Sequence, residues 1–257
     1  MQDLTIVKVG GKVVEEADSL FGLLNDFVSL PSPKILVHGG GRSATSVAAR
    51  LGIETKMVEG RRITDGAMLE VVTMVYGGLV NKGVVSGMQA RGCNALGMTG
   101  ADMNIIQSVK RTNSAIDYGF VGDIKEVNAN AIDALLKADV VPVIAPLTHD
   151  GNGQLLNTNA DTMASALASA MSALYRVTLV FCFELPGVLK DIDNPESVIS
   201  IINPNVYENL KRDGVVADGM IPKLDNSFDA LKKGVYQIKI TNTAGLAIPS
   251  AGTVLKL

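Results

Sequence analysis

Short apolar runs of strand length alternate with longer stretches of helical period along almost the whole chain. The apolar runs are rich in β-branched residues and occupy Leu4–Val9, Ile35–Val37, Val140–Ala145, Val177–Cys182 and Gln237–Ile240. The helical stretches are Ser19–Leu30, Ser43–Leu51, Ala67–Gln89, Ala131–Lys137, Thr162–Met171 and Lys223–Lys233. Because parallel strands need crossover connections, this alternation predicts an α/β fold. We expect a mainly parallel central sheet with helices on both faces, an α/β/α sandwich.

One more polar segment interrupts the alternation. Residues 105–127 place Thr, Val and Phe positions on either side of Asn113-Ser114, a pair typical of turns. This pattern predicts a β-hairpin inserted between the α/β units. Proline and glycine mark no long linker anywhere, so any two lobes are expected to share one sheet.

Composition narrows the possible partners. The chain has 257 residues, 47% hydrophobic and 19% charged, which is typical of a globular protein. A net charge of −3 offers no basic field to a nucleic acid, and the absence of Trp disfavours base stacking. We expect no apolar run to reach bilayer length, and Cys93 and Cys182 lack metal-site spacing. We therefore expect no nucleic-acid or membrane partner, reduced thiols and a cytoplasmic location.

Two glycine-rich turns directly follow the first two apolar runs. They are Lys8-Val9-Gly10-Gly11-Lys12 and His38-Gly39-Gly40-Gly41. Ligands of open α/β sheets bind beyond the carboxyl ends of the strands, where glycine amides can converge on an anion. Neither turn fits the Walker A or the dinucleotide pattern. The alternatives are an ordinary tight turn for the first and a flexible loop for the second, and His38 suits either a packed or a catalytic role.

Two later segments supply a carboxylate and a lysine. Asn157-Thr158-Asn159-Ala160-Asp161 leads into a helical stretch, where Thr158 or Asn159 can cap the helix. Asp218-Gly219-Met220-Ile221-Pro222-Lys223 places a lysine beyond a proline suited to a first helical turn, although a solvated surface lysine would give the same pattern. Together the four segments indicate a site that transfers a phosphoryl group.

Arginine and glycine add two further features. Arg61-Arg62 lies before the long Ala67–Gln89 stretch, where an arginine can bind a carboxylate with two parallel hydrogen bonds, or simply carry surface charge. That stretch contains Gly77, Gly78, Gly83 and Gly87. Each glycine inside a helix costs about 1 kcal/mol relative to alanine, so we expect another backbone to pack closely there, a subunit interface being one candidate.

With these segments in view, the chain resembles the amino-acid kinase superfamily, most closely its acetylglutamate branch. The resemblance covers nearly the whole chain and follows the family's blocks in order. Besides the four segments above, those blocks are Gly60–Asp65, Gly97–Asp102, Gly119–Ile124 and Pro142–Pro146. Arg62 and the Asn-x-Asn-Ala-Asp block favour the acetylglutamate branch over aspartokinase, carbamate kinase or uridylate kinase.

The resemblance implies an activity and roles for individual residues. The activity is ATP-dependent phosphorylation of the side-chain carboxylate of an N-acylated glutamate, in arginine biosynthesis, with Mg²⁺ held by the nucleotide phosphates rather than by the protein. Asp161 would hold the ammonium groups of Lys8 and Lys223, the catalytic lysines. The implied substrate-binding residues are Gly40, Gly41, Arg62 and Asn157. The implied phosphate- or nucleotide-binding residues are Gly10, Gly11, Asn159, Glu184, Gly187, Gly219 and Met220.

The resemblance also implies an organisation. Residues 1–172 would form an N-terminal lobe for the acyl amino acid and for dimerisation, and residues 173–257 a C-terminal lobe for ATP. A homodimer through helix 67–89 is expected. The alternatives are a non-catalytic regulatory module of the same fold that binds an amino acid or a nucleotide, and a kinase for N-succinylglutamate, in which Arg42 would meet the second carboxylate.

Three positions depart from the family pattern. The segment Phe181–Gly187 reads Phe-Cys-Phe-Glu-Leu-Pro-Gly where relatives usually have Thr or Ser followed by Asp. Met103 stands where relatives often have glycine, and the segment Ala244–Gly252 is shorter than usual. The first departure bears directly on the nucleotide contacts implied for Glu184.

Overall fold

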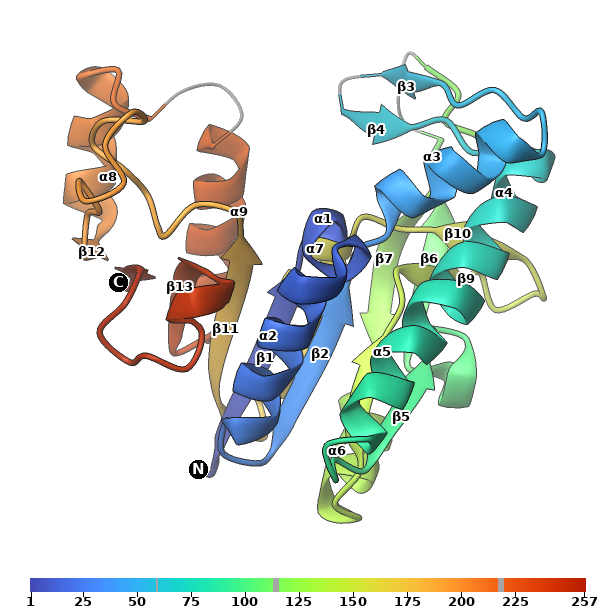
Figure 1. Cartoon of the computed structure of the whole chain (residues 1–257), viewed down its shortest axis with the longest axis horizontal. Coiled ribbons are helices and arrows are strands. Elements are labelled where there is room, and N and C mark those ends of the chain that lie inside the picture. Colours follow the sequence, from blue (N-terminus) through green and yellow to red (C-terminus); the bar gives the residue numbers. More distant parts are fainter. Residues whose placement is uncertain (59, 113–115, 217–219) are drawn as a thin grey trace.

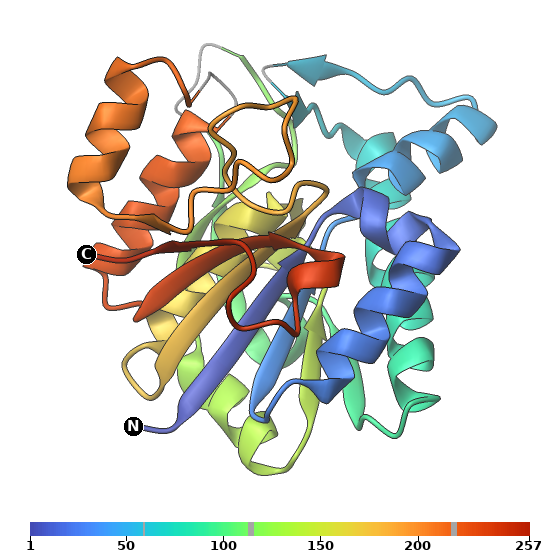
Figure 2. The same cartoon turned by 60° about the vertical axis from the view of Figure 1, so that its left-hand side comes forward.

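An eight-stranded sheet forms the centre of the computed structural model, which describes residues 1–58, 60–112, 116–216 and 220–257 (Figures 1 and 2). The strand order is β12-β14-β13-β11-β1-β2-β8-β5. All neighbouring pairs are parallel except β13 and β14. The bounds are β1 Asp3–Val9, β2 Lys34–His38, β5 Ala95–Met98, β8 Val141–Ile144, β11 Arg176–Phe183, β12 Ile201–Ile202, β13 Gln237–Asn242 and β14 Thr253–Leu255.

The sheet confirms the predicted fold class. The five apolar runs lie within or across β1, β2, β8, β11 and β13. Strands from both sides of residue 172 pair in the same sheet, with β1 hydrogen-bonded to β11 along its whole length. The division into lobes at residue 172 itself stays a prediction.

Helices cover both faces of this sheet. One face packs its side chains, including Leu4 and Ile6 of β1, against α6 Ala129–Lys137, α7 Ala160–Met171 and α9 Ile221–Lys232. The opposite face, including Val7 and Val9, packs against α2 Ala17–Ser29, α3 Gly41–Arg50 and the helix over residues 66–89. Successive side chains of a strand point to opposite faces, so Lys8 shares the face of Ile6, toward α7.

Short helices complete the fold. They are α1 Gly11–Glu15, directly after β1, and α8 Pro204–Arg212, together with the 3₁₀ turns η2 Asp102–Asn104 and η3 Thr243–Gly245. Met103 in η2 has left-handed backbone angles (φ 52°, ψ 17°). Glycine adopts this conformation without the steric cost that a side chain brings, so Met103 is under local strain here.

The predicted hairpin is confirmed, but it belongs to a second sheet. Strands β6 Ile106–Lys110 and β7 Gly122–Val127 pair antiparallel. With β9 Leu147–His149 and β10 Leu155–Asn157 they form a four-stranded sheet in the order β10-β9-β6-β7. The predicted turn at Asn113-Ser114 lies outside the described residues. A third, two-stranded sheet pairs β3 Met57–Val58 with β4 Arg61–Arg62.

The long predicted helix is continuous but not uniform. It runs as α4 Gly66–Val72, a π-helical segment η1 Thr73–Val80 and α5 Asn81–Gln89 (Figure 1). A Cβ at Gly87 would lie 2.5 Å from Leu24 Cδ1, and one at Gly77 would lie 3.5 Å from Leu147 Cδ1. At Gly78 and Gly83 a Cβ would meet no described atom within 4 Å. Core packing therefore accounts for Gly87 alone, because a Cβ at Gly77 would make only an ordinary van der Waals contact, and Gly78 and Gly83 face away from the described chain.

The same helix bears on the question of membranes. Among the described residues, helix 66–89 is the one helix long and apolar enough to cross a bilayer, by length and composition. The expectation that no run reaches this length was therefore wrong by this criterion. The core helix of a soluble protein satisfies the same criterion. One side of this helix, including Met68, Val72 and Met88, is buried in the core.

Candidate active site

Lys8 and Asp161 form an ion pair at the carboxyl end of β1. The Lys8 Nζ lies 2.7 Å from Asp161 Oδ1, and Lys8 is only 7% exposed. Asp161 is in the first turn of α7, where a carboxylate interacts favourably with the helix dipole. The strand therefore presents a buried ammonium group toward α7, where a carboxylate compensates its charge.

Lys223 and Lys8 contact the same aromatic ring. The Nζ of Lys223 is 4.2 Å from the ring centre of Phe183, and the Nζ of Lys8 is 4.9 Å from the same centre. The expectation that Asp161 contacts both lysines is met only for Lys8, because the ammonium group of Lys223 lies over the ring of Phe183 instead. Lys223 is in the first turn of α9, after Pro222, as its sequence predicted.

The two glycine turns pack against each other, backbone to backbone. A Cβ at Gly39 would lie 2.8 Å from the amide nitrogen of Gly11, and one at Gly11 would lie 3.2 Å from that of Gly40. The Gly39 amide donates to the Val9 carbonyl, and the Gly10 amide donates to the Cys182 carbonyl. Close approach, rather than flexibility, therefore explains these glycines.

Gly40 also supports the neighbouring helix. A Cβ at this position would lie 2.9 Å from Cδ1 of Tyr76, whereas one at Gly41 would meet only Arg62 Nη2, at 3.8 Å. Replacing Gly40 would therefore disturb packing as well as any ligand, which makes it a poor probe of binding alone. Gly41→Ala tests the ligand with less effect on the fold.

His38 anchors the second glycine turn from inside the core. The residue is fully buried, its Nδ1 lies 2.7 Å from the Gly39 carbonyl oxygen, and its Nε2 lies 3.1 Å from Nδ2 of Asn81. Since Asn81 donates, the ring is neutral, with its proton on Nδ1. Burial lowers the pKa of His38 to about 4. The packed, hydrogen-bonded role of this histidine fits the structure.

A cavity of about 210 Å³ lies beside the second glycine turn. Three of its residues are arginines, Arg61, Arg62 and Arg111. The other residues that line it are Gly39, Gly40, Gly41, Met57, Gly60, Tyr76, Val121, Pro146, Asn157, Thr158, Asn159 and Ala160. It therefore brings together the four predicted substrate-binding residues, Gly40, Gly41, Arg62 and Asn157, in a setting suited to carboxylates.

Arg62 is fixed by contacts from both of its terminal nitrogens. Nη2 donates to the Gly41 carbonyl at 2.7 Å and to Thr45 Oγ1 at 2.9 Å, while Nη1 donates to Thr55 Oγ1 at 3.2 Å. The side chain is nearly buried, with 9% exposure for the residue. These contacts place the guanidinium in the cavity wall with one orientation.

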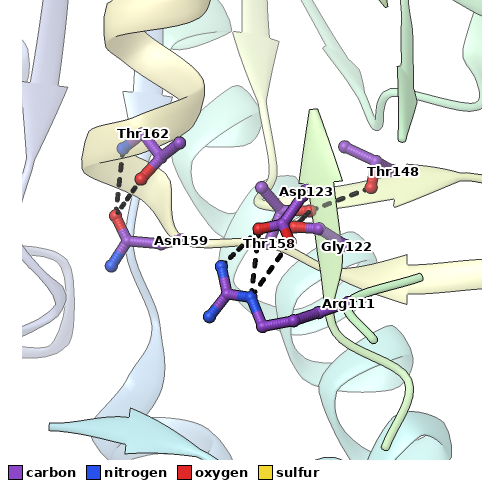
Figure 3. A network of polar contacts seen from close by, with 7 residues as sticks. All are labelled: Arg111, Gly122, Asp123, Thr148, Thr158, Asn159 and Thr162. Atoms are coloured by element: carbon purple, nitrogen blue, oxygen red, sulfur yellow. Dashed lines mark hydrogen bonds and ion pairs between the residues drawn. The ribbon is translucent and has the colours of Figure 1, made fainter. Parts of the chain in front are cut away.

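Asparagines enter the same cavity from β10 and α7. Asn157 donates from Nδ2 to Thr64 Oγ1 at 2.9 Å. Asn159 caps α7, because its Oδ1 accepts from the Thr162 amide at 3.0 Å (Figure 3). The capping alternative is therefore correct for Asn159, and its Nδ2 points away from Thr162 (Figure 3).

Arg111 is a site residue that the sequence did not single out. Its guanidinium binds both carboxylate oxygens of Asp123 across the β6–β7 hairpin (Figure 3). The hydrogen bonds with Asp123 raise the pKa of Arg111. Tyr76, in the π-helical segment η1, is a second such residue, and burial raises its pKa. Neither belongs to a segment that the sequence assigned to the site, so only the fold reveals them.

A second cavity, of about 570 Å³, lies in the part of the chain after β11. Its lining is mostly apolar, and it includes two of the predicted nucleotide-binding residues, Gly187 and Met220. The other lining residues are Leu185, Val188, Leu189, Lys190, Asp191, Ile192, Gly214, Val215 and Val216. Glu184 is exposed and does not line it, and Gly219 lies outside the described residues.

The paired lysines stand between the two cavities. Ala160, next to Asp161, lines the first cavity, while Met220 and Leu185, close in sequence to Lys223 and Phe183, line the second. In the sheet, β1 with Lys8 lies between β2, which leads into the glycine turn of the first cavity, and β11, which ends at Phe183 shortly before the lining of the second. Arg42 is exposed and is absent from the lining of the first cavity, so the solvent-facing alternative fits it.

This fold and site define a class of enzymes that transfer phosphoryl groups to small acceptors. Residues 3–242 match the model of the amino acid kinase family, and the chain belongs to that family. It is 58% identical, over 99% of its length and 99% of the relative's, to a protein from Bacteroides thetaiotaomicron named acetylglutamate kinase.

Solved structures share the fold at lower identity. The crystal structure of smu.665 from Streptococcus mutans UA159 matches with a TM-score of 0.80 and 23% identity, covering 100% of this chain and 99% of that one. Carbamate kinase from Giardia lamblia bound to AMP-PNP matches with a TM-score of 0.73 and 13% identity, covering 100% and 99%. These likenesses concern the fold alone.

Proposed function

We propose that this chain transfers a phosphoryl group from ATP to the side-chain carboxylate of N-acetyl-L-glutamate, giving an acyl phosphate and ADP in arginine biosynthesis. The name and high identity of the Bacteroides relative support this activity. The observation that carries the proposal is the position of Lys8 and Lys223 between an arginine-lined cavity and an apolar one.

The chemistry needs no general base. A glutamate carboxylate has a pKa of about 4.3, so it is already an anionic nucleophile at neutral pH. The protein has to bring two anions together and stabilise the charge that spreads over the transferred group. Two ammonium groups and the glycine amides can do this, and His38 beside the site is buried and neutral.

The substrate end of the reaction is assigned to the first cavity. Arg62 and Asn157 are proposed to bind the α-carboxylate and its surroundings, and Gly40 and Gly41 to present amides to the acyl amino acid. Arg61 adds positive charge to the same wall, whereas the charge of Arg111 is already compensated by Asp123. A substrate with two carboxylates matches the two guanidinium groups, Arg61 and Arg62, that have no carboxylate partner among the described residues.

The nucleotide end is assigned to the second cavity and to the first glycine turn. Its size and apolar lining suit a nucleoside, with Gly187 and Met220 in the wall. Gly10, Gly11 and Asn159 are proposed to face the phosphates, and Glu184 and Gly219 complete the assigned set. Mg²⁺ would bind to the nucleotide phosphates and supply further neutralisation there.

The organisation of the whole protein is part of the same proposal. Residues 1–172 would bind the acyl amino acid and residues 173–257 the nucleotide. A homodimer would form through helix 66–89, which exposes Met74 and Leu79 beside Gly78 and Gly83. A cytoplasmic location is supported by the two cysteines, which are both free and buried.

A coupled assay of ADP release tests the proposal. We expect ADP to form only when ATP, Mg²⁺ and N-acetylglutamate are all present. A regulatory module of the same fold would bind one of these ligands without releasing ADP. Saturable binding measured by calorimetry, together with no ADP release, would therefore replace the kinase proposal with the regulatory one. Running N-succinylglutamate in parallel tests the alternative acyl group.

A further inference from the structure

Phe183 occupies an unusual place among the charged groups of the site. It is the last residue of β11, and both lysines of the site lie over its ring, at 4.9 Å for Lys8 and 4.2 Å for Lys223. The three residues come from three elements, β1, β11 and α9. The ring of Phe181 stacks on Phe183 with centres 5.9 Å apart, which restricts its orientation.

In the part of the chain that the structure describes, only one of the two lysines at the ring has a carboxylate partner. Asp161 pairs with Lys8, whereas Lys223 forms no ion pair with any carboxylate among the described residues. Two ammonium groups over one ring repel each other, most strongly before a phosphate is bound. The face of an aromatic ring carries negative electrostatic potential and attracts cations. Phe183 therefore offers both lysines a favourable contact that needs no anion.

We propose that Phe183 is a positioning residue that holds the ammonium groups of Lys8 and Lys223 at the place of phosphoryl transfer. This role rests on the proposed kinase function. A Thr or Ser at this position would give the lysines no ring to share. The ring acts on the groups that stabilise developing charge, so its loss lowers kcat more than it raises KM.

Graded fluorination of Phe183 separates this electrostatic role from packing. Mono-, di- and trifluorophenylalanine keep nearly the same shape while progressively weakening the negative potential of the ring face. We expect kcat to fall with each added fluorine, and Phe183→Leu to lower kcat about 3- to 30-fold. The same series at Phe228 is the matched control, since Phe228 lies on α9 like Lys223 and stacks on Tyr207. There kcat should stay constant.

A spectroscopic measurement tests the geometry without turnover. In protein labelled with ¹³C-lysine, the ε-CH₂ protons of Lys8 and Lys223 should be shifted upfield by the ring current of Phe183, with assignments from Lys8→Arg and Lys223→Arg. Phe183→Leu should abolish both shifts. Shifts that persist in Phe183→Leu, or a kcat that is constant across the fluorinated series of an active enzyme, would overturn the proposal. An inactive wild-type protein would instead refute the kinase function. The ring-current measurement would then still test whether the two lysines contact the ring of Phe183.

Discussion

At the scale of single residues, the buried ring of His38 has a partner for each of its nitrogens. Nδ1 contacts the Gly39 carbonyl and Nε2 contacts Asn81. The contact with Asn81 requires an unprotonated Nε2 and therefore the neutral ring, whereas Nδ1 can donate to the Gly39 carbonyl in either form. The histidine therefore fixes the glycine turn from behind rather than reacting with substrate.

His38 predicts a specific dependence of stability on pH. Its pKa is about 4 in the folded protein and about 6.5 in the unfolded chain, so between these values the unfolded chain binds the extra proton. The free energy of unfolding should accordingly fall as pH drops from 6.5 to 4, by about 3 kcal/mol from this residue, and level off below. Urea unfolding of the wild type and of His38→Gln at several pH values measures this contribution. The other titratable groups contribute equally to the two proteins, so the difference between them belongs to His38. Identical pH slopes in the two proteins would contradict the assignment.

Arg62 predicts a change in substrate affinity. Its fork reaches Gly41, Thr45 and Thr55 at once, and the single ammonium of lysine cannot reproduce that geometry. Because a carboxylate contact exists in the ground state and the transition state alike, Arg62→Lys should raise KM for N-acetylglutamate about 10- to 100-fold while kcat changes less. Steady-state kinetics measure both, with the exposed Arg50→Lys as control. An unchanged KM would remove Arg62 from the substrate site.

At the scale of elements, the strands that were predicted correctly are those buried on both faces. β1, β2, β8 and β11 are almost continuous runs of large apolar residues, and such runs are typical of the central strands of a parallel sheet. β5 escaped prediction because Ala95 and Gly97 dilute its pattern. β9, β10, β12 and β14 span only two or three residues, too few for any periodicity to appear.

The π-helical segment was also beyond prediction. Its hydrogen-bond pattern changes the rotation per residue without changing the residue types, so the sequence predicts one long, uniform helix. This segment affects the geometry of the site, because Tyr76 lies in it and packs against Gly40. Likewise, nothing in the sequence placed Phe183 against both lysines, since that contact depends on the ends of three separate elements meeting.

The outward face of the long helix predicts the state of association. Leu79 is 65% exposed and Met74 54%, next to glycines whose missing side chains leave room for a second backbone. If two copies of the chain pair here, Leu79→Glu would place a charge in the buried interface and so disfavour the dimer. The measured mass should then fall from that of two chains to that of one. Light scattering coupled to size exclusion measures this. Leu51→Glu, at a similarly exposed leucine at the end of α3, should leave the mass unchanged.

A wild type that already runs at the mass of one chain would contradict the dimer directly. A dimer that survives Leu79→Glu would place the interface elsewhere. In either case the outward glycines, Gly78 and Gly83, would lack a packing partner in solution. No contact with a second chain would then offset the cost of these glycines to helix stability.

At the scale of the whole molecule, one sheet joins two cavities of different chemistry. The arginine-lined cavity lies beside β2 and its glycine turn, and the apolar cavity lies beyond β11. β1 pairs with both of these strands and carries Lys8 next to its last residue. The lysines, the carboxylate and both glycine turns could be identified from the sequence, because each is tied to the end of a predicted element. Arg111 and Tyr76 in the cavity wall could not, because their places depend on packing between distant segments.

The turnover of Lys8→Met tests the proposed phosphoryl transfer most directly. Methionine keeps the apolar stem of the buried side chain and removes only the ammonium group, which leaves the buried Oδ1 of Asp161 without its ion-pair partner. With saturating ATP, Mg²⁺ and N-acetylglutamate, we predict a kcat about 10²- to 10³-fold below that of the wild type, in a protein with a similar circular-dichroism spectrum. A folded Lys8→Met protein that releases ADP at close to the wild-type kcat would contradict the role of Lys8 and, with it, the proposed mechanism.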